Sequence, residues 1–319
     1  MLNQNEFLAS LFNLVVETRV NRTAEGRRIN DLIDSCLVDT IEYGEGKLLV
    51  SVDTLDVADY NENTSLLTTK KPTIDEQYIE TTDRKVIQVT INRYLMKGAF
   101  ANEYALAECI STIESMLEKT KNIYMYKKIV KAYEDWTPVD GEGETRTTQV
   151  VTIDLIDTTG MTGVELVESK KANALTIYEK IKELSLDIQT PSRNFNELGF
   201  EEMYNADELD FIVNGKFESL VNTYAIASLL NSEKLDNIQL YEKSIIIPSS
   251  QFTSENAKTK LIGILASKYK YQVAPRFSVT TSFSDASNLN MNEFLHFWLN
   301  SGFANGLAGV KLMANFVQP

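Results

Sequence analysis

Residues 101–135 read ANEYALAECISTIESMLEKTKNIYMYKKIVKAYED, a long stretch without proline or glycine. Apolar residues recur in it at steps of three, four and seven, which places them on one stripe of a helix. Asn102 suits the N-cap, and Glu103 lies beside the positive end of the helix dipole. The stretch therefore predicts one amphipathic helix. Its apolar positions are Leu106, Ile110, Ile113, Leu117 and Tyr124, then Tyr126, Val130 and Tyr133.

The length of this predicted helix bears on function. It would span about 50 Å at 1.5 Å per residue, longer than the usual globular helix. A subunit of a shell or fibre needs such a helix, whereas a small enzyme rarely does. A long helix in an ordinary α+β domain is the alternative, and this stretch alone leaves both open.

Composition narrows the function classes. The chain has 319 residues, 43% hydrophobic content and a net charge of −14. Such an acidic chain lacks the cationic surface that coats nucleic acid, although it can still enclose nucleic acid. The start, MLNQNEFLASLFNLVV, does not resemble a signal peptide, and no apolar run has the length of a membrane span. We therefore expect a cytoplasmic protein with no membrane partner.

The chain before the long helix changes character near residue 37. Residues 4–35 have helical pieces separated by the polar run Arg19 to Arg28, which is typical of an arm. Two β-rich runs within residues 37–58 flank Gly44-Glu45-Gly46, and this predicts a hairpin. A polar loop with Pro72 and a further β-rich run continue to residue 97.

Strands and helices alternate after Trp136, so the predicted class is α+β. Residues 271–283 give the clearest strand, with Tyr271, Val273, Phe277, Val279 and Phe283 on one face. The last 30 or so residues hold an aromatic cluster, 294–298, and a glycine-spaced apolar tail, 302–310. The other predictions are strands at 151–155, 209–213, 245–247 and 261–265, a helix at 164–187, an irregular loop at 188–206, and a helix with Phe217, Leu220, Val221, Tyr224 and Ser228 aligned.

Catalytic side chains are scarce in this sequence. His296 is the single histidine, and any Ser-His-Asp or Cys-His arrangement would have to use it. Its neighbours Phe294, Leu295, Phe297 and Trp298 indicate core or interface instead. Cys36 and Cys109 are far apart, so we expect two reduced, buried thiols and no zinc site.

Three other motifs favour ordinary structural roles. Asp59 to Asn63 match the first ligands of a calcium loop, but Thr64 and Lys70 replace its glycine and glutamate, so a solvated acidic loop is expected. Gly302 to Gly309 lack the Lys-Ser or Lys-Thr of a phosphate loop, which favours turns and tight packing. Lysines 119, 121, 127, 128 and 131 alternate with acids, which indicates a solvated face with ion pairs. We therefore predict no catalytic, cofactor-binding or metal-ligating residues, no cofactor and no enzyme.

Three patches in order resemble one family. EQYIETTDRKVIQVTINRYLMKGAFANEYALAECISTIESMLEKTKNIYMYKKI, LDFIVNGKFESLVNTYAIASLLN and FSVTTSFSDASNLNMNEFLHFWLNSGFANGLAGV are similar to segments of capsid proteins of short-tailed, phi 29-like phages (podoviruses). The order of elements resembles the Hong Kong 97 type fold of tailed-phage major capsid proteins. Together the patches cover about half of the chain.

This resemblance implies a role for each region. Residues 1–36 would be an amino-terminal arm reaching a neighbour, and 37–98 an extended loop with return strands that lap over the adjacent subunit. Residues 99–163 would form a peripheral domain with the spine helix, 164–270 an axial domain, and 271–319 closing strands shared with the peripheral domain.

The resemblance also implies function and partners. The chain would self-assemble, as pentamers and hexamers, into the icosahedral head of a bacteriophage, enclosing double-stranded DNA without sequence-specific binding. Assembly would occur in the host bacterial cytoplasm, with a portal and a separate scaffolding protein, and without amino-terminal cleavage because the chain begins at Met1. An encapsulin-like nanocompartment shell protein and an α+β hydrolase or binding protein are the alternatives.

Overall fold

The computed structural model describes residues 29, 31–38, 47–55, 57, 71–92, 103–140, 142–226, 241, 243–285 and 290–318. The chain divides into two compact units, each built from separated parts of the sequence. Unit 1 comprises residues 1–47, 79–129 and 272–302, and unit 2 comprises residues 48–78, 130–271 and 303–319. Both contain helix and sheet, so the α+β prediction is confirmed.

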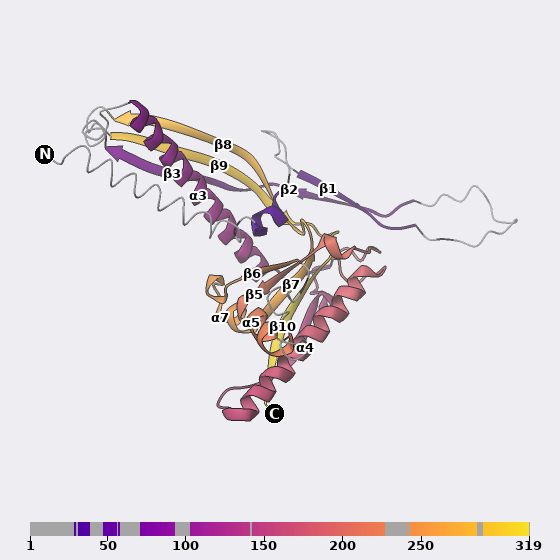
Figure 1. Cartoon of the computed structure of the whole chain (residues 1–319). Helices are drawn as coiled ribbons and strands as arrows, with labels where there is room; N and C mark the ends of the chain where they lie inside the picture. The colour runs from indigo at the N-terminus through magenta and orange to yellow at the C-terminus, as the bar shows by residue number, and fades with distance from the viewer. Residues whose placement is uncertain are drawn as a thin grey trace. The chain divides into compact units, whose positions relative to one another are not determined.

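Unit 1 is a long helix on a three-stranded sheet. The strands are β3 (Thr81–Asn92), β9 (Asn290–Phe303) and β8 (Tyr271–Asp285), in the order β3-β9-β8. Helix α3 (Glu103–Asp135) runs along this sheet in unit 1 (Figure 1). β3 and β9 are antiparallel, with Val86 opposite His296. The predicted long helix is therefore confirmed, and its last turns belong to unit 2.

The apolar stripe of α3 is confirmed where side chains are described, from residue 115 onward. Leu117, Tyr126, Val130 and Tyr133 are buried, and Ile129 is fully buried. Leu106, Ile110, Ile113 and the N-cap Asn102 fall outside the described side chains. Burial at steps of three and four keeps this stripe on one side of the helix.

Part of the predicted arm is described in unit 1. Residues 31–36 are helical, with Leu32, Ile33 and Cys36 buried, and Leu37 forms a parallel bridge with Val273. Residues 1–28 and 30 of the arm and the predicted turn Gly44-Glu45-Gly46 lie outside the described residues.

Unit 2 is built on a five-stranded sheet in the order β4-β10-β7-β5-β6. β10 is parallel to β4 and antiparallel to β7, so the last strand of the chain lies inside the sheet. β4 alternates between exposed and buried residues, while β5 and β7 are buried throughout, as their continuous apolar runs predict. The bounds are β4 Val150–Ile156, β5 Leu209–Asn214, β6 Ser244–Ile247, β7 Leu261–Ser267 and β10 Gly309–Val317.

Helices cover this sheet. α4 (Gly163–Gln189) buries Ala174, Ile177, Ile181 and Leu184 in the core of unit 2, which confirms the helix predicted at 164–187. α5 (Gly215–Val221) begins after Asn214, whose side chain accepts from the Lys216 N–H, and continues as a π-helical turn, Asn222–Ile226. Unit 2 also contains α7 (Glu255–Lys260) and the 3₁₀ turns Thr147–Gln149, Ala206–Glu208 and Ser249–Gln251.

Strands β1 and β8 show features that the sequence pattern did not specify. β1 (Lys47–Val52) pairs with β2 (Ile74–Ile79) in a two-stranded sheet. The hairpin predicted around Gly44-Glu45-Gly46 needs residues outside the described part of the chain, so it stays a prediction. In β8, the apolar residues predicted to share one face differ in burial: Tyr271 and Val273 are 4% and 1% exposed, whereas Val279 and Phe283 are 40% and 63% exposed. Alternation along a strand indicates which side chains share a face. It does not show whether another layer of structure covers that face.

Candidate assembly surfaces

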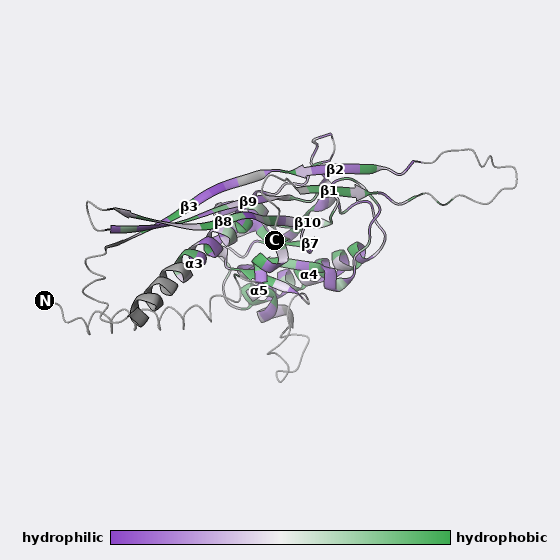
Figure 2. Cartoon of the chain, turned by 90° about the horizontal axis from the view of Figure 1, so that it is seen from above, coloured by the Kyte–Doolittle hydropathy of each residue, from purple (hydrophilic) through white to green (hydrophobic). Residues whose placement is uncertain are grey.

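The β1–β2 ribbon, residues 48–55 and 71–78 of unit 2, has an exposed apolar face. Leu48, Val50 and Val52 of β1 are 53–55% exposed, and Ile74 and Tyr78 of β2 are 53% and 57% exposed. The Asp53 N–H donates to the Thr73 carbonyl at 3.0 Å, so in an antiparallel pair these five side chains share one face. Hydrophobic residues, green in Figure 2, lie on both strands. A face of this kind marks an interaction surface.

Polar contacts within unit 2 hold both strands of the ribbon. The Gln77 amide donates to the Phe303 carbonyl at 2.6 Å and accepts from the Asn305 N–H at 3.0 Å. Asp53 forms an ion pair with Arg193 at 2.8 Å and accepts from the Glu201 N–H at 3.0 Å. These hydrogen bonds and this ion pair lower the pKa of Asp53. Two loops, after α4 and after β9, therefore hold the ribbon near both of its ends.

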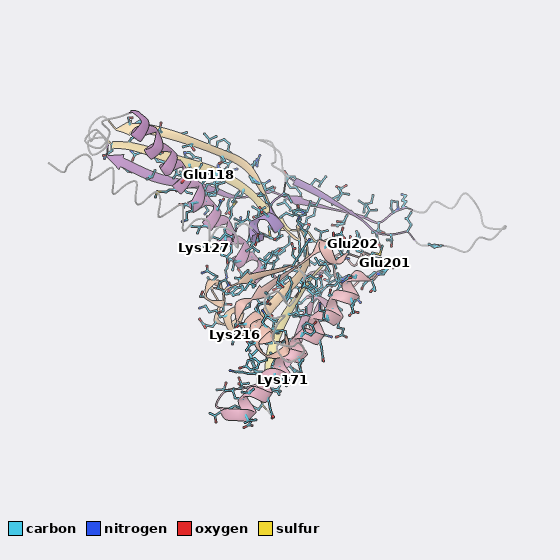
Figure 3. The ribbon with its side chains drawn as sticks, viewed as in Figure 1. Glu118, Lys127, Lys171, Glu201, Glu202 and Lys216 are labelled. Carbon is cyan, nitrogen blue, oxygen red and sulfur yellow. The ribbon has the colours of Figure 1, made fainter. Side chains whose placement is uncertain are left out.

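Glycines allow one of these loops to pack closely. A Cβ on Gly306 would lie 2.1 Å from the Ser51 hydroxyl, and one on Gly309 would lie 2.9 Å from the Trp136 ring. Neither position has room for a side chain. The prediction of turns and tight packing for Gly302 to Gly309 is confirmed. Figure 3 labels Glu201 and Glu202, which lie in the loop after α4.

The face of the three-stranded sheet away from α3 is a second apolar surface, in unit 1. Val86 is 54% exposed, and the Phe277 and Trp298 rings lie 5.0 Å apart between centroids. Because cross-strand partners share a face, Trp298 and His296 lie beside Arg84 and Val86. We call this surface the outer sheet face; its residues are Val86, Phe277, Val279, Phe283, Phe294, His296 and Trp298.

The opposite face of the sheet carries polar contacts to α3. Asp83 forms an ion pair with Lys128 and accepts from the Tyr124 hydroxyl at 2.9 Å. Burial alone would raise the pKa of Asp83, but these two donors hold it below its ordinary value. Lys121 pairs with Glu118 at 3.3 Å. The prediction that the α3 lysines form ion pairs is confirmed for Lys121, Lys128 and Lys131, the last with Asp135.

The structure places His296 differently from the sequence expectation. It is half-buried on the outer sheet face and stacks on Phe294 with 6.1 Å between ring centroids, while Leu295 and Phe297 enter the core. The idea of a core position is wrong, and an interface position stays a prediction. Successive strand residues point to opposite faces, so an apolar neighbourhood in sequence need not surround the histidine.

Other candidate sites give few contacts to interpret. Cys36 is buried, and the side chain of Cys109 lies outside the described residues, as do Asp59 to Asn63, Thr64 and Lys70. No group of metal-ligating side chains occurs among the described residues. None of the helices in this part of the chain is long and apolar enough to cross a membrane. The described features with functional character are therefore the two apolar surfaces.

A chain with apolar surfaces exposed on both of its units has the character of a subunit that assembles with copies of itself. Comparison with known proteins identifies the assembly. Residues 2–305 match the model of the Phi29-like phage major capsid protein family. The chain belongs to this family: it is a major capsid protein of a bacteriophage virion, which self-assembles into the icosahedral head shell.

Solved capsids share the fold. The capsid structure of Staphylococcus phage Andhra matches with a TM-score of 0.58 at 9% identity, covering 86% of this chain and 81% of that chain. The capsid structure of Cyanophage P-SCSP1u matches with a TM-score of 0.57 at 12% identity, covering 89% of this chain and 87% of that chain. The capsid of a native GTA particle gives 0.53 at 10% identity, covering 90% of each chain. No curated protein matches the sequence. The Hong Kong 97 type fold is thereby confirmed, and the nanocompartment and hydrolase alternatives are not favoured.

Proposed function

We propose that copies of this capsid protein form pentamers and hexamers in which the ribbon of one copy packs on the outer sheet face of the next. The observation that carries this proposal is the exposed apolar face of the ribbon. The ribbon face is exposed and the outer sheet face is partly exposed in the single chain, so a neighbouring copy can cover them. A contact between two different surfaces repeats around an axis and closes a ring.

The regional roles fit this arrangement. Residues 1–36 act as an arm to a neighbour, and 37–98 as the overlapping loop. Residues 99–163 form the peripheral domain and 164–270 the axial domain around the five-fold or six-fold axis. Residues 271–319 serve both, since β8 and β9 join β3 while β10 lies in the five-stranded sheet.

Further partners are inferred from the charge of the chain and from its family. With a net charge of −14, the shell encloses double-stranded DNA without sequence-specific contacts, because it does not neutralise phosphates broadly. A portal and a separate scaffolding protein guide closure in the host bacterial cytoplasm. The protein acts as a structural subunit and not as an enzyme, with no catalytic, cofactor-binding or metal-ligating residue and no membrane partner.

Disulfide cross-linking tests the ribbon contact. A chain carrying Val50→Cys and Val279→Cys is assembled and oxidised, and we expect a ladder of linked copies on a denaturing gel. Each single variant should stay monomeric on that gel. The matched control pairs Val50→Cys with Lys171→Cys, an exposed position on α4. Shells that form normally with no ladder, or with equal ladders in both pairs, would contradict the contact.

A further inference from the structure

Lys270 is a charged side chain in an unusual position. It follows the turn between β7 and β8 and is 0% exposed. Tyr269 before it has a positive φ of 65°, and the Lys270 N–H donates to the Ser267 carbonyl at 3.0 Å. Burial of an ammonium group costs free energy unless partners surround it. The arrangement of those partners is informative.

The Lys270 ammonium joins two loops of unit 2 from the inside. It donates to the Ala304 carbonyl at 3.0 Å and the Leu307 carbonyl at 2.7 Å, both in the turn after β9. It forms an ion pair at 3.4 Å with Glu197 in the loop after α4. The Trp136 indole N–H donates to the same carboxylate at 3.0 Å. Burial lowers the pKa of Lys270 to about 8, although Glu197 and Glu202 oppose this.

These two loops are the ones that contact the ribbon. The turn after β9 binds Gln77 through Phe303 and Asn305. The loop after α4 binds Asp53 through Arg193 and the Glu201 N–H. The Glu197 N–H also donates to the Asn305 carbonyl at 3.0 Å, beside the buried ion pair. Each strand of the ribbon thus rests on a loop that Lys270 contacts or stabilises through Glu197.

We propose that Lys270 is a positioning residue for assembly, whose ammonium group holds both loops together and so sets the direction of the β1–β2 ribbon. This rests on the proposed function, in which the ribbon packs on a neighbouring copy. A ribbon held in one direction loses less conformational entropy when it binds. Without the ammonium group, the chain keeps its core but presents the ribbon in many directions.

Hydrogen exchange of unassembled full-length chain tests this role. The variant Lys270→Met/Glu197→Gln removes both buried charges together, because leaving one unpaired would destabilise the core. We expect amide exchange in residues 47–55 and 71–79 to become at least about tenfold faster, while β5 and β7 change less than about threefold. Closed shells at equal protein concentration should become scarcer.

A matched control is Lys311→Met, which removes an ammonium group from the carbonyls of Glu134 and Trp136 and removes no hydrogen bond made by the ribbon loops. The rate of amide exchange in the ribbon should be unchanged in this control variant. If the double variant Lys270→Met/Glu197→Gln does not fold, Lys270→Gln/Glu197→Gln keeps N–H donors at both positions without either charge, and the same ribbon-selective increase is expected. Unchanged ribbon exchange in a folded variant, or equal acceleration in ribbon and core strands, would overturn the positioning role.

The outcome is separable from that of the cross-linking experiment. Exchange is measured on single copies, so it does not depend on which surface the ribbon meets. A selective effect on the ribbon together with a failed cross-link would retain the role of Lys270 and reject the proposed contact.

Discussion

At the scale of the residue, buried polar groups connect parts of unit 2 that are far apart in sequence. Glu134, near the end of α3, accepts from the Thr253 N–H at 2.9 Å, the Thr253 hydroxyl at 2.6 Å and the Ser254 N–H at 2.6 Å. Burial alone would raise its pKa, but these hydrogen bonds lower the pKa to about 2. Hydrogen bonds to an ionised group are among the stronger ones in proteins. The ionised carboxylate therefore stabilises the end of α3.

Glu134→Gln should lower the free energy of unfolding by about 2 kcal/mol at pH 7. A carboxyl group whose pKa is depressed in the folded state stabilises the protein above its unfolded pKa. That stabilisation is lost as the pH falls from about 4.5 through about 2. Urea unfolding at pH 7, 4 and 2.5 measures it, and the difference between wild type and variant should shrink along this series.

The control for this prediction is Asp135→Asn. Asp135 is the next residue, and its exposed carboxylate pairs with Lys131 at 2.7 Å. Exposed pairs contribute little, so the change should stay within about 0.5 kcal/mol. A Glu134→Gln effect of the same size at every pH would contradict the role of the ionised carboxylate.

At the scale of the element, α3 is the feature that the sequence predicts best. Its bounds, Glu103–Asp135, match the predicted stretch, because a run without proline or glycine and with a helical apolar period favours a continuous helix. Helix α4 and the buried strands β5 and β7 were likewise predicted from local sequence patterns. The partner of β1 was not predictable, since pairing joins residues across a long loop that leaves no local pattern.

Leu117→Pro tests the continuity of α3. Leu117 is buried, and a proline there removes a backbone hydrogen bond and clashes with the preceding turn, which costs about 3 kcal/mol or more. We expect a lower free energy of unfolding in urea and no closed shells by electron microscopy. Leu117→Met conserves volume and should assemble normally. Shells from the proline variant with wild-type yield would show that assembly tolerates a broken helix.

At the scale of the whole molecule, capsid function depends on surfaces that a single copy leaves exposed. The ribbon face and the outer sheet face lie in different units, and the arm precedes both in sequence. Many weak contacts then add up through multiplicity, so that no single contact has to be strong. Removing one contact should reduce assembly more than it reduces the stability of the isolated chain.

Deletion of residues 1–28 tests this expectation. The truncated chain keeps Leu32, Ile33 and Cys36, which are buried in unit 1, so its free energy of unfolding should stay close to that of the full chain. Closed shells should be lost, as seen by electron microscopy and sedimentation at matched concentration. The full chain under identical conditions is the control, and normal shells from the truncated protein would refute a role for the arm.

The sequence by itself determined helices α3 and α4, the buried strands β5 and β7 and the α+β class, because periodicity and apolar runs are local properties of the chain. It also determined the resemblance to phi 29-like capsid proteins, which the family comparison confirms. Only the tertiary structure decided that β1 pairs with β2, that β10 lies inside a sheet, and that His296 faces outward. Only the tertiary structure shows that Lys270 contacts Glu197 and the turn after β9. These contacts join residues distant in sequence, and their free energy depends on burial and partners that no local pattern records.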